Sequence, residues 1–168
     1  MNSILQAIEQ TAFSTWVRES GSIWAFPTIL FVHTFGMVLV AGSSAFMSLV
    51  LLGCWPKMPI KPLEKLYPLM WWGFVVNAIT GTILLIGDVS TKLTNWDFGL
   101  KMIFIFIGVW VLQKTRKTVF GDPRLDLEPV TPQAKKLAWA SLVCWFFAIV
   151  CGRLRAYVGP VSGLEGGN

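Results

Sequence analysis

Long apolar runs, separated by short polar stretches, make up most of the chain. A helix needs about 20 predominantly apolar residues to cross the hydrocarbon core of a bilayer. Four runs are long enough for this role, or nearly so, and they lie at about 23–53, 69–87, 98–112 and 136–157. The pattern therefore predicts one all-α integral membrane domain over residues 1–168, built around a four-transmembrane-helix bundle.

The first and third runs depart from the ordinary length of a membrane span. The first is about 30 residues long, so its helix is expected to tilt in the bilayer or to bend near 41–44. The third is short, and it spans the membrane if Lys101 at its beginning extends toward the interface. Small residues in the second and fourth runs predict close helix contacts. These residues are Gly73, Asn77, Gly81, Ala138, Ser141, Ala148 and Gly152.

The N-terminal segment, residues 1–20, has a different pattern. Between residues 3 and 19 the apolar positions recur at helical spacing on one side only, which is typical of an amphipathic helix. Such a helix lies in the membrane interface, or it docks on the bundle, and the pattern leaves both open. The apolar positions are Ile4, Leu5, Ile8, Ala12, Phe13, Trp16 and Val17.

Composition supports a membrane protein and argues against several soluble classes. The chain is 54% hydrophobic and 14% charged, and a soluble domain of 168 residues could not bury that much apolar surface. Its net charge of +5 is explained by the excess of Lys and Arg that membrane proteins keep in cytoplasmic loops, so we expect no nucleic-acid partner. The three cysteines lack the pairing of a disulfide framework or a zinc site.

The distribution of positive charge predicts the orientation of the chain. Four spans place both termini on the same side, and the loops between spans one and two and between spans three and four hold most of the Lys and Arg. The positive-inside rule then places both termini outside the cytoplasm. The loop cations, with those at the beginning of span four, are Lys57, Lys61, Lys65, Lys114, Arg116, Lys117, Arg124, Lys135 and Lys136, against Arg18, Lys92, Lys101, Arg153 and Arg155 on the other side.

The chain has one histidine, His33, about ten residues into the first span. On the predicted orientation it lies in the extracytoplasmic half of the membrane. An ionisable group inside a membrane is costly, so it is a functional candidate by default. A neutral imidazole that hydrogen-bonds a neighbouring helix is the structural alternative, and both interpretations stay open.

Cationic and phenolic side chains are predicted at the same side as His33. They are Lys101, Arg153, Arg155 and Tyr157. Arginine binds carboxylate and phosphate groups bidentately, which favours an anion site, whereas snorkelling to the interface is the structural alternative. Haem b fits the set as a whole, because iron takes the imidazole of His33 and the propionates take Arg, Lys or Tyr.

A single histidine limits how such a haem is held. The iron is five-coordinate, or it takes a methionine such as Met37, Met70 or Met102, or a second chain supplies the other ligand. Met37 lies one turn from His33 on the same helix, so it cannot be the opposite ligand. The sequence shows no nucleotide-binding, zinc-protease or nucleophile-elbow motif, so we predict no catalytic residue and no enzyme activity of the chain alone.

Short motifs at both ends of the chain resemble a known family. They are Trp24-Ala-Phe-Pro27, His33-Thr-Phe-Gly36, Gly42-Ser43, Leu51-Leu52-Gly53, Ser141-Leu-Val-Cys-Trp145 and Gly152-Arg153-x-x-Ala156-Tyr157. The chain is similar in these to small bacterial four-helix integral membrane proteins that share a domain of unknown function. Members often carry acidic residues before the His motif and before Leu-Leu-Gly, where this chain has apolar and small residues. The resemblance implies the four-helix fold and a bacterial inner (plasma) membrane.

Two classes of function follow. In the first, the chain is a multi-pass membrane subunit that binds haem b, or another anionic cofactor, for electron transfer. In the second, it is a non-catalytic structural or assembly subunit, or a small permease-like protein, and the same residues only hold helices together. In both, its partners are the lipid bilayer and other membrane subunits or further copies of the chain.

Overall fold

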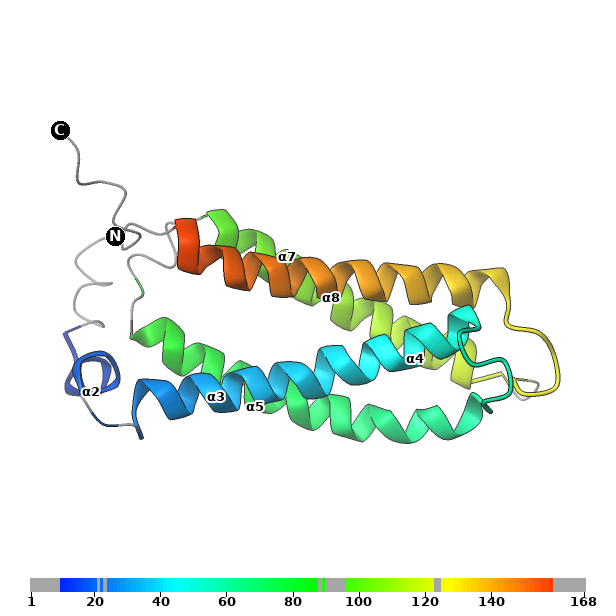
Figure 1. Ribbon diagram of the computed structural model, residues 1–168, viewed down its shortest axis with the longest axis horizontal. Helices are drawn as coiled ribbons and strands as arrows, with labels where there is room; N and C mark the ends of the chain where they lie inside the picture. Colours follow the sequence, from blue (N-terminus) through cyan, green and yellow to red (C-terminus); the bar gives the residue numbers. More distant parts are fainter. Residues whose placement is uncertain are drawn as a thin grey trace.

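The computed structural model is an elongated bundle of helices (Figure 1). It describes residues 10–20, 22, 24–87, 89, 96–122 and 125–158, without the side chains of 18 and 154–158. The regular elements over these residues are all helical. In chain order they are α2 (Ala12–Glu19), α3 (Phe26–Met37), η1 (Val38–Gly42), α4 (Ser43–Leu52), η2 (Lys61–Lys65), α5 (Leu66–Ile86), α7 (Trp96–Thr115), η3 (Arg116–Phe120) and α8 (Pro132–Val158).

Four stretches of helix are long and apolar enough to cross a membrane. They cover Phe26–Leu51, Lys61–Ile86, Trp96–Phe120 and Pro132–Arg153, with 22 to 26 residues each. This confirms the all-helical chain with four candidate spans. The second stretch begins earlier than 69 and the third ends later than 112, because polar residues outside the hydrocarbon need not interrupt a helix. A 3₁₀ turn, η2, precedes α5, and a π-helical turn, η3, follows α7.

Local sequence explains where these helices begin and end. Pro27 lies in the first turn of α3, where its missing N–H is not needed. At the end of α4, Gly53 adopts a φ of 94°, and the N–H groups of Gly53 and Cys54 donate to Val50 and Leu49. This is the Schellman arrangement, which favours glycine because a side chain is strained at positive φ.

The first span changes its packing partner at a π-helical segment. Upstream of η1, α3 packs along α5, and downstream of it, α4 packs along α8. Figure 1 shows α3, η1 and α4 as one continuous helix whose axis is not straight. A π-helical turn is a common cause of a bend in a helix, and this one adjoins the bend predicted near 41–44.

Buried side chains gather toward the end of the bundle where α4 finishes and α5 begins. One core cluster there joins α4, η2, α5, α7, η3 and α8. A second, smaller cluster lies nearer the middle, where α3 and η1 meet α8. The first cluster consists of Met47, Val50, Leu51, Ile60, Leu63, Tyr67, Met70, Leu112, Val119, Ala134 and Ala138.

The described part of the N-terminal segment, α2, docks on the other end of the bundle. Thr11 caps this helix through its side chain, and Ser14 Oγ donates to the carbonyl of Ile86, 3.1 Å away, at the end of α5. Val17 is buried. Phe13 and Trp16, by contrast, are exposed and stack on each other. The predicted amphipathic helix also includes residues before position 10, and these lie outside the described residues.

Candidate functional site

His33 lies in the seam between α3 and α5. Its Nδ1 is 3.1 Å from Oγ1 of Thr80. The Thr80 hydroxyl in turn lies 2.7 Å from the carbonyl oxygen of Val76, to which it donates its one proton. Because that proton is already used, Thr80 accepts from His33, and Nδ1 must carry the imidazole proton. A neutral ring in this tautomer has its electron pair on Nε2.

Glycines bring the two helices close enough for this bond. A Cβ at position 81 would lie 3.1 Å from His33 Cε1, so the ring is seated directly on the backbone of α5. One turn further along, a Cβ on Gly36 would lie 2.9 Å from the carbonyl oxygen of Gly73. The predicted stripe of Gly73, Asn77 and Gly81 is thus confirmed as a close helix contact.

The cation Lys101 lies in the other helix pair, α7 and α8. Its Nζ is 3.5 Å from the point that a Cβ of Gly152 would occupy, so its side chain runs across that glycine. Arg153 follows and is exposed. The buried positions of Ala138, Ser141 and Ala148 confirm the small-residue face of α8. They are supported by a hydrogen bond of 2.8 Å between Ser44 and Ser141.

The structure places these groups at one end of the bundle but in separate pairs. His33 belongs to α3 and α5, and Lys101 and Arg153 belong to α7 and α8. All three lie within about 12 Å of the ends of their helices along the axis, counting 1.5 Å per residue. The side chains of Arg155 and Tyr157 lie outside the described residues.

The contact between His33 and Thr80 is compatible with a histidine that would hold a metal or a haem. A ligating histidine usually donates its other ring N–H to a neighbouring acceptor, which fixes its orientation, and Thr80 is such an acceptor. Met70 is not a candidate for the second ligand, because it is fully buried in the core cluster about 15 Å along α5 from Thr80. The described residues contain no group of three or more His, Cys, Asp or Glu that could hold a metal.

Trp145, the last residue of the Ser141–Trp145 motif, adds a buried polar group for which the sequence predicted no role. Its indole is buried against Gly108, and its Nε1 has no hydrogen-bond partner among the described residues. A buried donor of this kind is normally satisfied by a bound water or ligand. It lies in the cluster with Val40, two helical turns along the first span from His33.

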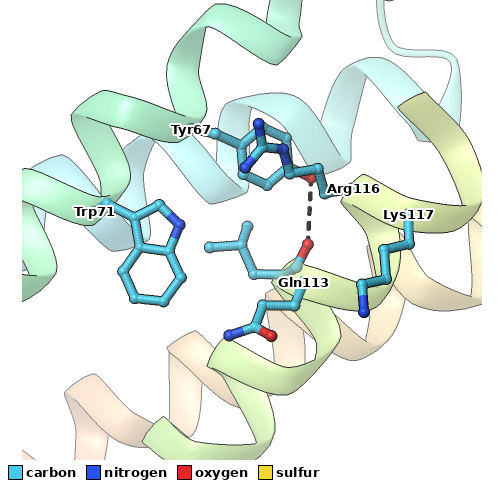
Figure 2. A pocket seen from close by; sticks show the side chains of 6 residues that line it. Tyr67, Trp71, Gln113, Arg116 and Lys117 are labelled. Carbon is cyan, nitrogen blue, oxygen red and sulfur yellow. Dashed lines mark hydrogen bonds between the residues drawn. The ribbon is translucent and has the colours of Figure 1, made fainter. Parts of the chain in front are cut away.

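A pocket of about 280 Å³ lies at the opposite end of the bundle (Figure 2). Tyr67 donates a hydrogen bond of 3.3 Å to the carbonyl of Leu112, and the guanidinium of Arg116 lies over its ring. From their place between two apolar runs, Arg116 and Lys117 were expected only as loop charges. The aromatic pair four residues apart, Tyr67 and Trp71, was the available signal. The pocket is lined by Tyr67, Trp71, Leu112, Gln113, Arg116 and Lys117.

Comparison with known proteins adds nothing to the assignment of either end of the bundle. The resemblance of the short motifs to small bacterial four-helix proteins stays a prediction. No protein-family model, curated protein or solved structure matches the chain.

Proposed function

We propose that the chain is a small multi-pass subunit of a bacterial inner membrane in which His33 holds haem b. On this proposal the site lies in the extracytoplasmic half of the bundle, and both termini are extracytoplasmic. The chain performs no reaction alone and passes electrons to or from another membrane subunit. When bound, haem supplies reversible one-electron transfer.

The tautomer of His33 carries this proposal. Thr80 holds the proton on Nδ1, which leaves the electron pair on Nε2, the nitrogen through which a histidine ordinarily binds iron. A ligating histidine commonly donates its other ring N–H to a neighbouring acceptor in this way, which fixes the orientation of the ring.

The cations at the same end support the proposal through charge. Lys101 and Arg153 come from the facing helix pair and would offset the negative charge of two propionates. Arg153 is exposed, so water can replace its contact with a propionate. Lys101 is half-buried against Gly152, so its charge is the more firmly placed of the two.

A structural subunit is the second candidate, and the close seat of His33 on Gly81 favours it. An imidazole that packs on a glycine and bonds to Thr80 is already a helix–helix connector. In this case α3 and α5 are held together by the same contacts and no cofactor is involved. The two candidates differ in whether the purified protein shows the absorbance of a bound haem.

Absorption spectroscopy separates them. We expect protein purified from haem-replete cells to show a Soret band that His33→Ala removes. Thr34→Ala is the matched control, since its hydroxyl bonds only within its own helix, to Leu30. Wild-type protein that is folded, and that still shows no Soret band after incubation with haemin, would falsify the haem proposal and favour the structural one.

The native Cys54 tests the orientation. It is exposed in the loop after α4, whereas Cys144 and Cys151 are buried. A membrane-impermeant thiol reagent should label Cys54 only after the cells are permeabilised. Trp24→Cys, at an exposed position on the other end, should be labelled in intact cells. The reverse pattern would show that the termini are cytoplasmic.

A further inference from the structure

The pocket in Figure 2 has an apolar inner level and a cationic outer level. On α5, Trp71 lies one turn deeper in the bundle than Tyr67. On α7 and η3, Leu112 and Gln113 lie one turn deeper than Arg116 and Lys117. Because residues four apart stack on one helix face, each helix supplies both levels. The pocket thus changes from apolar to positively charged toward the end of the bundle.

The two cations keep most of their capacity to bind an anion. Arg116 Nε lies 3.7 Å from Glu64 Oε1, and both side chains are about half exposed. Such a pair is weak and easily exchanged. Lys117 is exposed, and no hydrogen bond or ion pair joins it to the part of the chain that the structure describes. Arginine has five donors in a planar fork, which suits a phosphate oxygen pair.

Exposed tryptophans place the pocket at the membrane boundary. Trp72 and Trp110 lie on α5 and α7 near the level of the pocket. At the same end of the bundle, Trp55 lies in the loop that follows α4, and Trp139 lies on α8. A ring of exposed tryptophans marks the headgroup region of a bilayer. The cationic level of the pocket therefore faces the layer in which phosphates lie.

We propose that this pocket binds the phosphodiester headgroup of an anionic phospholipid. Arg116 and Lys117 bind the phosphate, Gln113 offers an amide, and Trp71 and Leu112 contact the glycerol and the first carbons of the chains. About 280 Å³ accommodates a headgroup and not a whole lipid, so the acyl chains remain in the bilayer. Basic pockets between membrane helices are a recurrent form of lipid recognition.

The apolar inner level decides between a lipid and a free anion. Inorganic phosphate or a soluble phosphate ester would gain nothing from Trp71 and Leu112, whereas a lipid covers both. The site is independent of the proposed haem, because it lies at the opposite end of the bundle. Loss of one proposal therefore leaves the other standing.

Native mass spectrometry of the full chain in detergent tests the proposal. Titration with dioleoyl phosphatidylglycerol should give tighter binding of the first lipid than titration with dioleoyl phosphatidylcholine. Arg116→Gln with Lys117→Gln should lower this preference by about fivefold per cation removed. Lys117→Gln alone, at a position without described partners, should lower it about fivefold without affecting folding.

A matched pair of variants controls for total charge. Lys135→Gln with Lys136→Gln removes the same charge at the same end of the bundle, from exposed positions outside the pocket. This variant should keep the preference. The proposal is overturned if the pocket variants keep the preference or if the control loses it equally. It is also overturned if inorganic phosphate displaces phosphatidylglycerol at equal concentration, which would assign the site to a free anion.

Discussion

The two ends of the bundle are built differently. At the end that contains Tyr67, all four candidate membrane spans contribute to one core cluster, and α4 alone buries five residues. At the end that contains His33, the helices form two pairs, α3 with α5 and α7 with α8, and Gly36 is the buried residue of α3. Figure 1 shows the two pairs diverging toward this end.

The physics of a bilayer explains how four such helices can share a core at one end only. Lipid chains are as apolar as leucine, so an unpaired apolar face is not penalised as it would be in water. Polar groups at the open end must instead be satisfied within each pair. His33 with Thr80 is such an arrangement, and it places a polar site where the packing between pairs is weakest.

The largest effect should come from a cavity in the shared core. Leu51→Ala removes a side chain that is 0% exposed and should lower the free energy of unfolding by about 2–5 kcal/mol. Leu30→Ala, at a position that is 42% exposed on α3, should change it by only about 0.5 kcal/mol. Unfolding in a denaturing detergent measures both. Equal losses would show that the two ends are equally packed.

Overpacking a glycine contact should have the next largest effect. A Cβ at Gly73 would lie 2.7 Å from Cβ of Leu39, so Gly73→Ala must push α3 and α5 apart and should cost about 1–3 kcal/mol. Gly99→Ala is the control, because no heavy atom lies within 4 Å of the added methyl group. The same unfolding assay applies. If both changes are harmless, the helix pair is looser than described.

Charges on α2 should release it without unfolding the bundle. Phe13 and Trp16 lie on the exposed face of α2, and this face anchors the helix if it contacts lipid. Phe13→Asp with Trp16→Asp places two carboxylates there and removes that anchor. We expect limited proteolysis to cleave the segment while the four membrane helices remain inserted. Ser14→Ala removes only the bond to Ile86 and should leave the segment protected. Failure of insertion would assign the segment to the bundle itself.

The smallest effect concerns the His33 bond in protein without cofactor. Thr80→Val removes the acceptor of the imidazole and should cost about 0.6 kcal/mol, the average for such bonds within a bilayer. Thr82→Val is the control, because this hydroxyl bonds only to Ala78 of its own helix. A difference between the two variants measures the interhelical bond. Identical stabilities would show that the bond does not form.

Several features of the fold were predictable because they depend on local sequence. The four apolar helices, the glycine stripe of α5 and the end of α4 at Gly53 all follow from composition and spacing. The lengths of the helices were harder to predict. The turns η2 and η3 extend α5 and α7 into Lys- and Arg-rich segments that the sequence predicted as loops. Charged residues at the end of a span face water whether they are helical or not, so charge does not mark where the helix ends.

The site was less predictable, because it depends on which helices pair. Apolar periodicity shows that a helix lies in a membrane but does not show which neighbour it contacts. The sequence predicted that His33, Lys101 and Arg153 lie on one side of a membrane, and the structure places them at one end of the bundle. It could not show that His33 contacts α5 while Lys101 contacts α8, nor that Tyr67 and Arg116 line a common pocket.

The sequence by itself determined four helices that are long and apolar enough to cross a membrane, because each holds about 20 mostly apolar residues, and its small residues marked the contact faces. It also supplied one imidazole for the polar site. Only the tertiary structure decided the tautomer of that imidazole, through the hydrogen bond from His33 to Thr80. The physical reason is that one partner 47 residues away in the chain sets the proton position, and such a distance is closed only when α3 packs on α5.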